Sequence, residues 1–127
     1  MIQGIFNKLF SKGDAPHDFA PMEQVGQMTL KLNDLVIGFL TCTNGEWTFK
    51  YSDEFQNQNE FHSIVGFPKL DKEYKSNELW PFFQIRIPGL KQPAIIETIK
   101  KEHIKNNEFD LLKRFGRKSV SNPYELV

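Results

Sequence analysis

The sequence is organised around the stretch Leu79-Trp80-Pro81-Phe82-Phe83-Gln84-Ile85-Arg86-Ile87-Pro88, its densest apolar segment. Strand-like sequence precedes this stretch and helix-like sequence follows it. Ser76 or Asn77 can cap a helix that begins here. Pro81 is tolerated only near the start of a helix, and Pro88-Gly89 ends it. The stretch therefore predicts a short or bent helix at the centre of the fold.

This helix is too apolar to bury all of its large side chains on one face. Helical spacing divides the residues into two groups, one on each side. The first group is Trp80, Phe83, Gln84 and Ile87, and the second is Leu79, Phe82 and Arg86. Because tryptophan and arginine dominate the energetics of interfaces, the stretch predicts contact with a partner, and plain core packing remains the alternative. The predicted partner-binding residues are Trp80, Phe83, Gln84, Arg86 and Ile87.

The first half of the chain predicts an antiparallel sheet. Apolar and polar residues alternate over residues 28–32 and 47–51, which is the period of a half-buried strand, and residues 36–43 read as a strand between them. Asn44-Gly45 is a strong hairpin signal, because a type I′ turn needs positive φ at both central residues. These segments predict a meander with one face available for burial.

The second half predicts loops and short helices. Residues 52–59 and 69–76 are polar and predict loops, and residues 61–67 between them predict a short edge strand. Residues 93–105 and 109–115 have the apolar periodicity of helices. The predicted fold is therefore α+β, with a small antiparallel β-meander in the first half packed against short α-helices in the second half.

The folded domain is predicted to span residues 25–127, after an N-terminal helix and linker extension over residues 1–24. Apolar residues at helical spacing within 1–10 predict an amphipathic helix or a docked terminus, and Pro and Gly within 11–21 predict a linker. The single cysteine, Cys42, excludes an intramolecular disulfide and suits a reducing cytoplasm. No membrane segment and no signal peptide are expected.

No set of residues predicts catalysis, a metal site or a bound cofactor. Sixteen basic and sixteen acidic residues balance, which argues against a broad basic surface for nucleic acid. His17, His62 and His103 lack the short spacing of metal ligands. The basic residues within 113–118 are compatible with phosphate contact, but the end of a helix favours cations equally well. No direct nucleic-acid binding is therefore expected.

Four segments resemble a known protein family. WTFKY (47–51) looks like the hairpin strand of the N-terminal subdomain of HipA-type kinases, and PFFQIRIP (81–88) resembles that subdomain's FF…LLP helix. FDLLKRFGR (109–117) is similar to its FDLL…GR helix end, and NPYEL (122–126) resembles its closing DPYEL segment. The resemblance covers about residues 25–127 and leaves the N-terminal extension unassigned.

The resemblance implies a protein-binding function rather than kinase activity. The sequence lacks the glycine-rich loop and the catalytic and metal-binding aspartates that phosphoryl transfer needs. It looks like a stand-alone, HipS-like subdomain of a split HipBST-type toxin–antitoxin system. This implies a cytoplasmic, non-enzymatic protein that binds a separate HipA-like (HipT) Ser/Thr kinase and restrains it. Three alternatives stay open: an activating or structural subunit that completes a split kinase, a partner of a HipB-like DNA-binding repressor in a ternary complex, and an unrelated binder of a small ligand.

Overall fold

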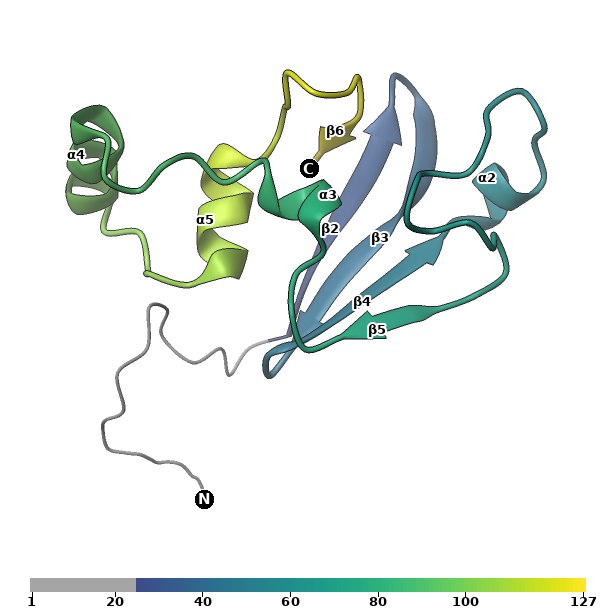
Figure 1. Cartoon of the computed structure of the whole chain (residues 1–127), viewed down its shortest axis with the longest axis horizontal. Coiled ribbons are helices and arrows are strands. Elements are labelled where there is room, and N and C mark those ends of the chain that lie inside the picture. The colour runs from purple at the N-terminus through teal and green to yellow at the C-terminus, as the bar shows by residue number, and fades with distance from the viewer. Residues whose placement is uncertain (1–24) are drawn as a thin grey trace.

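The computed structural model describes residues 25–127, and the predicted extension over residues 1–24 lies outside the described part. Five strands of the described chain form one antiparallel sheet in the order β5-β4-β3-β2-β6 (Figure 1). They are β2 (Val25–Leu32), β3 (Leu35–Thr43), β4 (Glu46–Tyr51), β5 (Tyr74–Ser76) and β6 (Glu125–Leu126). The helices of the same residues are α2 (Asp53–Gln56), α3 (Pro81–Gln84), α4 (Pro93–Glu102) and α5 (Glu108–Phe115). The predicted α+β class is confirmed.

Tight turns join the first three strands, as the sequence predicts. Asn44 (φ 48°) and Gly45 (φ 89°) lie between β3 and β4, and Thr43 pairs with Glu46 across the turn. Asn33 (φ 54°) turns β2 into β3. Positive φ is free of steric cost for glycine and tolerated by asparagine, so these residues favour the register of the meander.

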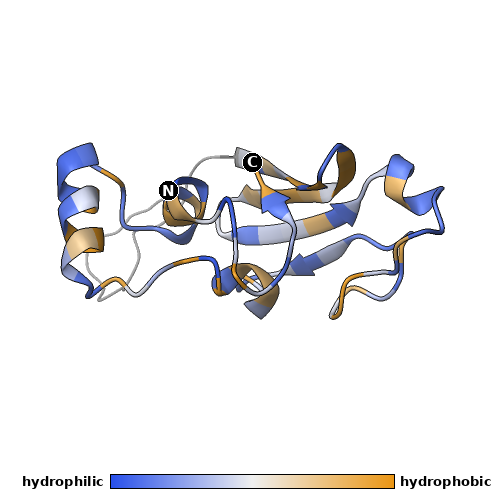
Figure 2. Ribbon diagram, turned by 90° about the horizontal axis from the view of Figure 1, so that it is seen from above, coloured by the Kyte–Doolittle hydropathy of each residue, from blue (hydrophilic) through white to orange (hydrophobic). Residues whose placement is uncertain are grey.

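One face of the sheet carries the hydrophobic core. Met28, Leu40 and Phe49 are neighbours across β2, β3 and β4, and all three are buried. Phe49 has further aromatic neighbours, since its ring centroid lies 5.1 Å from that of Tyr51 and 4.7 Å from that of Phe67. Hydrophobic and hydrophilic residues succeed one another along the strands (Figure 2). Each aromatic ring buries about 150–250 Å² of surface, so this cluster dominates the core.

The two longer helices differ in how they pack. α5 begins after Asn107, whose side chain accepts the Asp110 N–H at 2.8 Å, and it buries Leu111 and Leu112. α4 has no buried residue, and it lies at the far end of the molecule from the sheet, with α5 between them (Figure 1). α5 is therefore part of the core, whereas α4 is a peripheral element.

α4 ends earlier than the sequence predicts. Ile104 is expected on its apolar stripe, but the helix ends at Glu102, and His103 adopts a left-handed backbone (φ 55°). The Ile104 N–H donates to the Ile99 carbonyl oxygen at 3.0 Å, which is the bond of a Schellman-type helix end. Glu102 also accepts two hydrogen bonds from Arg114 on α5, at 2.6 and 3.0 Å. This exposed ion pair links the two helices and adds little stability.

The predicted edge strand over residues 61–67 is wrong. These residues are irregular, and the edge strand beside β4 is β5, which lies inside the predicted loop 69–76. The hydroxyl of Tyr51 explains the difference, because it accepts the Ile64 N–H at 2.9 Å and donates to the Phe67 carbonyl oxygen at 2.7 Å. One side chain thus satisfies backbone groups that a strand would pair with a neighbouring strand.

Two short elements are absent from the prediction. α2 forms inside the predicted loop 52–59, because the Ser52 hydroxyl caps it by accepting the Phe55 N–H at 3.0 Å. β6 pairs with β2, and next to it Thr29 and Val127 exchange two backbone hydrogen bonds of 2.7 and 2.8 Å. Both elements are shorter than the window over which a periodic pattern can be recognised.

Candidate partner-binding surface

The central stretch forms a helix that is shorter than predicted. α3 contains four residues, begins at Pro81 and has Trp80 as its N-cap. The predicted cap Ser76 does not cap α3. Its hydroxyl instead accepts the Glu78 N–H at 3.0 Å, in the turn before the helix. Pro81 suits the first helical position because its φ is fixed and it has no N–H to satisfy. α3 is therefore too short to divide its side chains into two regular faces.

Phe83 lies in the core rather than at the surface. It is fully buried, and its ring centroid lies 5.7 Å from that of Phe49 and 6.1 Å from that of Phe67. Leu79 is buried beside it, with 2 % of its surface exposed. Because Phe83 has no exposed atoms, it holds α3 against the sheet and does not reach a partner directly in this structure.

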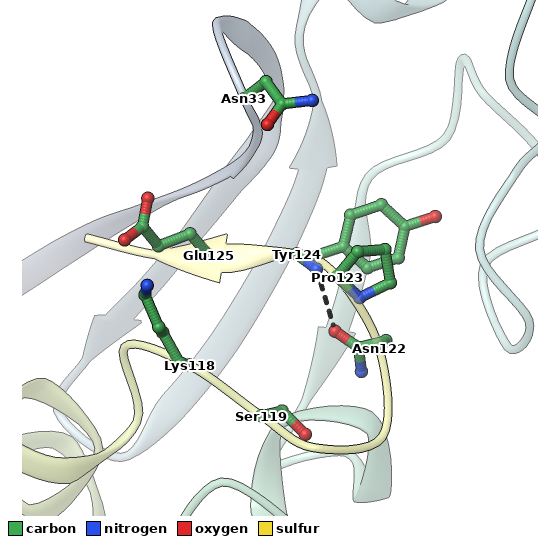
Figure 3. A pocket seen from close by; sticks show the side chains of 7 residues that line it. All are labelled: Asn33, Lys118, Ser119, Asn122, Pro123, Tyr124 and Glu125. Atoms are coloured by element: carbon green, nitrogen blue, oxygen red, sulfur yellow. Dashed lines mark hydrogen bonds between the residues drawn. The ribbon is translucent and has the colours of Figure 1, made fainter.

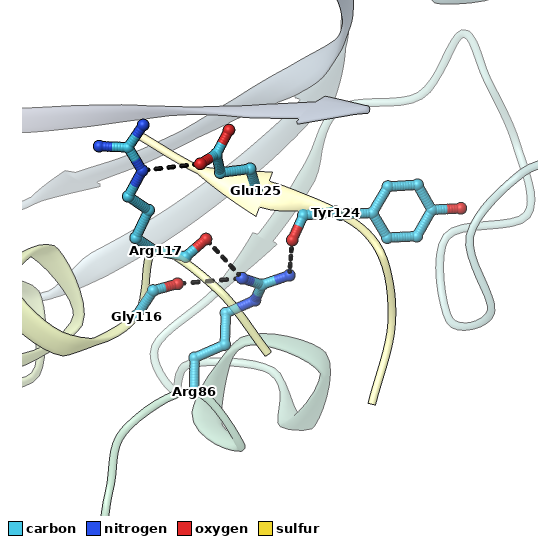
Figure 4. Close-up of polar contacts among 5 residues, drawn as sticks. All are labelled: Arg86, Gly116, Arg117, Tyr124 and Glu125. Carbon is cyan, nitrogen blue, oxygen red and sulfur yellow. Dashed lines mark hydrogen bonds and ion pairs between the residues drawn. The ribbon is translucent and has the colours of Figure 1, made fainter. Parts of the chain in front are cut away.

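Arg86 is also buried, with 4 % of its surface exposed. Its Nη1 donates to the carbonyl oxygens of Gly116 (3.0 Å) and Arg117 (3.2 Å) (Figure 4). Its Nη2 donates to Asn122 Oδ1 (2.8 Å) and to the Tyr124 carbonyl oxygen (2.9 Å). Burial lowers the pKa of the guanidinium from its usual value. Arg86 therefore clamps α3 to the end of α5 and to the C-terminal segment, and it too is withdrawn from direct partner contact.

The outward side of the stretch forms an apolar surface. Ile85 is 55 % exposed, and Val65 on the neighbouring loop is 93 % exposed. Together with the partly exposed Trp80 and Phe82, they line an open cavity of about 440 Å³. We call this the α3 surface, and its residues are Val65, Gly66, Phe67, Trp80, Pro81, Phe82 and Ile85. Clustered exposed apolar side chains of this kind are typical of interaction sites.

Aromatic contacts hold the α3 surface in place. The Trp80 ring meets the buried Phe67 ring edge-on, with centroids 5.2 Å apart and an interplanar angle of 78°. Phe82 meets Phe83 edge-on at 5.1 Å and 87°. The Tyr51 hydroxyl fixes the backbone of Phe67 through the 2.7 Å hydrogen bond described above. The surface is therefore ordered before any partner binds, which lowers the entropic cost of binding.

The structure divides the five predicted contact residues into two groups. Trp80 lines the α3 surface, Gln84 is exposed, and Ile87 is partly buried against the core. Phe83 and Arg86 lie in the interior. The stretch is thus core on one side and surface on the other, and its predicted contacts do not form one continuous patch.

Of the seven residues of the α3 surface, the sequence predicts only Trp80, and the missed side chains include Val65, Phe82 and Ile85. Phe82 and Ile85 belong to the quoted stretch, but regular helical spacing gives no reason to place them with Trp80. Val65 has no signal at all in the sequence, because its exposure depends on how the loop backbone is held by the distant Tyr51 hydroxyl.

Buried titratable side chains in the described chain have structural roles. Burial raises the pKa of the Cys42 thiol, which disfavours the reactive thiolate. Burial also raises the pKa of Tyr51 to about 12. Among residues 25–127, no group of three or more His, Cys, Asp or Glu side chains is placed to hold a metal ion. No helix of the same residues is long and apolar enough to cross a membrane.

The fold and the site define a small α+β module whose main feature is a preorganised apolar surface. A family model described as the HipA N-terminal domain matches residues 28–120, and the chain belongs to this family. Three of the four resembling segments, in β4, α3 and α5, lie inside the match, and residues 122–126 lie beyond it. Membership associates the chain with HipA-like kinase toxin–antitoxin systems. A comparison with curated proteins gave no match.

Proposed function

We propose that the chain is a non-enzymatic, HipS-like subunit that binds a separate HipA-like Ser/Thr kinase and restrains it. The observation that carries this proposal is the α3 surface, whose apolar side chains remain exposed in a chain of the HipA N-terminal domain family. The family match covers the N-terminal domain of HipA and no kinase domain. We propose that the kinase activity resides in the partner.

Burial of the α3 surface supplies the driving force for binding. Full burial of a side chain the size of valine or isoleucine is worth about 1.5–3 kcal/mol. Val65 and Ile85 are the exposed branched aliphatic side chains of the surface and gain from contact. Trp80 and Phe82 are already held by aromatic neighbours, so they lose little rotamer freedom when a partner covers them.

Two physical routes lead from binding to restraint. The chain can cover the ATP or substrate cleft of the kinase, or it can stabilise an inactive arrangement of the kinase. The second route requires tighter binding to the inactive than to the active arrangement. Both routes need a rigid module, and Phe83 and Arg86 provide this rigidity by fixing α3 from the inside.

Co-expression with a HipA-like kinase that lacks this domain tests the proposal. The chain should co-purify with the kinase and restore growth, and Trp80→Ala should lose both effects. Ile96→Ala is the control, because Ile96 is an exposed isoleucine (36 %) on the peripheral helix α4. Toxicity that requires the chain would instead identify an activating or structural subunit. Failure to co-purify would contradict the proposal.

A further inference from the structure

The loop that joins α5 to β6 projects from the body of the molecule (Figure 1). Figure 3 shows its base, where Lys118, Ser119 and Asn122 line a polar hollow of about 280 Å³. Residues 117–124 contain no helix or strand. Val120 is fully exposed, and Ser121 beside it is exposed. A protein kinase must draw its acceptor into a cleft, and an irregular, exposed segment allows this.

Ser121 differs from the other serines of the described chain. Ser52 is buried, and its hydroxyl donates to a backbone carbonyl oxygen at 2.6 Å. The hydroxyls of Ser76 and Ser119 each accept a backbone N–H at 3.0 Å. Ser63 is partly buried. Among the described residues, Ser121 alone combines exposure with a hydroxyl that makes no hydrogen bond.

Two exposed basic residues precede Ser121 in the sequence, and one of them, Arg117, is ion-paired with Glu125 at 2.7 Å. Lys118 lies three residues before it, and Arg117 lies four residues before it. Protein kinases distinguish their substrates partly by the pattern of charges around the acceptor. The loop therefore fits a kinase that selects basic residues on the amino-terminal side of its acceptor serine.

Arg86 provides a second, independent observation. This buried guanidinium donates only to neutral oxygens of the described chain, and its Nε has no hydrogen-bond partner there. One of its acceptors is the side chain of Asn122, the residue that follows Ser121. Arg86 and Lys118 thus place positive charge at the base of the loop, whereas Arg117 is paired with Glu125 at 2.7 Å. A phosphate group is stabilised where it faces clustered cations, through charge-assisted hydrogen bonds.

We propose that Ser121 is a phosphorylation site for a Ser/Thr protein kinase that selects upstream basic residues. In the transfer, Ser121 Oγ attacks the γ-phosphorus of Mg²⁺-bound ATP, and the bond from that phosphorus to the bridging oxygen of the β-phosphate breaks. ADP leaves with the electron pair, and the hydroxyl proton passes to the base of the kinase. The product carries about −1.5 to −2 charge at Ser121, three residues after Lys118 in the sequence.

Phosphorylation of the folded, full-length chain tests this assignment. The protein is incubated with ATP, Mg²⁺ and a purified kinase of this selectivity, and sites are located by fragmentation mass spectrometry. We expect one phosphoryl group on Ser121, its retention in Ser119→Ala, its loss in Ser121→Ala and slower transfer in Lys118→Ala. Transfer to another serine, or no transfer to the folded chain, would overturn the proposal.

Thermal unfolding of the phosphorylated protein gives a second test, whose result does not follow from the exposure of Ser121 alone. Because the new charge lies three residues after the exposed Lys118, the midpoint of thermal unfolding should rise at low salt and the gain should shrink at high salt. A lower midpoint after phosphorylation would show that repulsion from Glu125 prevails over attraction to the cations. That result would also overturn the assignment.

Discussion

The inward and outward sides of residues 79–88 use similar side chains for different purposes. On the inward side, Phe83 and Arg86 are at most 4 % exposed and join α3 to the sheet and to the C-terminal segment. On the outward side, Trp80 and Ile85 line the open α3 surface. One short segment therefore contributes both to the stability of the domain and to its proposed affinity for a kinase. Substitutions on the two sides should therefore have separable effects.

The largest expected effect comes from Phe83→Ala on the inward side. Removing a fully buried ring that contacts Phe49 and Phe67 should lower the free energy of unfolding by about 3–5 kcal/mol. Urea unfolding followed by fluorescence measures this change. A loss below about 1 kcal/mol would contradict the assignment of Phe83 to the core and erase the contrast between the two sides.

Arg86→Ala removes the hydrogen bonds that join the inward side of residues 79–88 to the C-terminal segment. Four acceptors lose their donor, and leaving buried polar groups unpaired should cost about 3 kcal/mol of stability. The C-terminal segment should also loosen, so the Leu126 N–H, which donates to the Arg117 carbonyl oxygen at 2.8 Å, should exchange faster with deuterium. Unchanged protection of Leu126 would mean that β6 is held without the clamp.

Trp80→Ala tests the outward side of residues 79–88, where the expected loss is in kinase binding. A hot-spot tryptophan should cost about 2 kcal/mol or more of binding free energy to a HipA-like kinase when removed. Stability should fall less than in Phe83→Ala, because Trp80 is already partly exposed. Isothermal titration calorimetry gives the affinity, and thermal unfolding checks the fold. Unchanged affinity in a folded variant would remove Trp80 from the interface.

A smaller effect should come from high pH, through the loop that carries Val65. The folded state raises the pKa of the Tyr51 phenol from 10.0 to about 12, so it holds this proton more tightly than the unfolded state does. The corresponding stability is complete below pH 10.0 and is lost as the pH rises to about 12. Unfolding measured across this range should show a steeper fall than in Tyr51→Phe. Equal slopes would contradict the proposed role of the phenol proton.

The meander of β2, β3 and β4 is the part of the fold that the sequence predicts best, because its signals are local, whereas β5 and β6 are not predicted. Asn44-Gly45 predicts a turn with positive φ at both residues, as observed. The alternation of apolar and polar residues over 47–51 predicts which side chains of this strand are buried. The apolar period over residues 109–115 likewise predicts α5, and the structure adds the Asn107 cap at its start. Each of these elements depends on neighbours within a few residues, so a single sequence contains the information.

The candidate site was predicted only in part, because its geometry depends on distant residues. Arg86 looks like an interface residue in sequence, but its acceptors lie 30 to 38 residues further along the chain. Only the folded C-terminal segment brings them together. The exposure of Val65 depends similarly on Tyr51, 14 residues earlier, whose hydroxyl holds the loop on both sides of Val65. Spacing within residues 79–88 does not reveal either effect.

A matched pair of isoleucine substitutions tests the central claim most directly. Ile85 lies on the α3 surface and Ile96 on the peripheral helix α4, and both are exposed. The affinity of Ile85→Asp and Ile96→Asp for a HipA-like kinase lacking this domain should be measured by calorimetry. If the α3 surface binds the kinase, Ile85→Asp should lower the affinity at least about tenfold, or 1.4 kcal/mol of binding free energy. Ile96→Asp should change the affinity little. Equal affinities of the two variants, or a loss confined to Ile96→Asp, would contradict it.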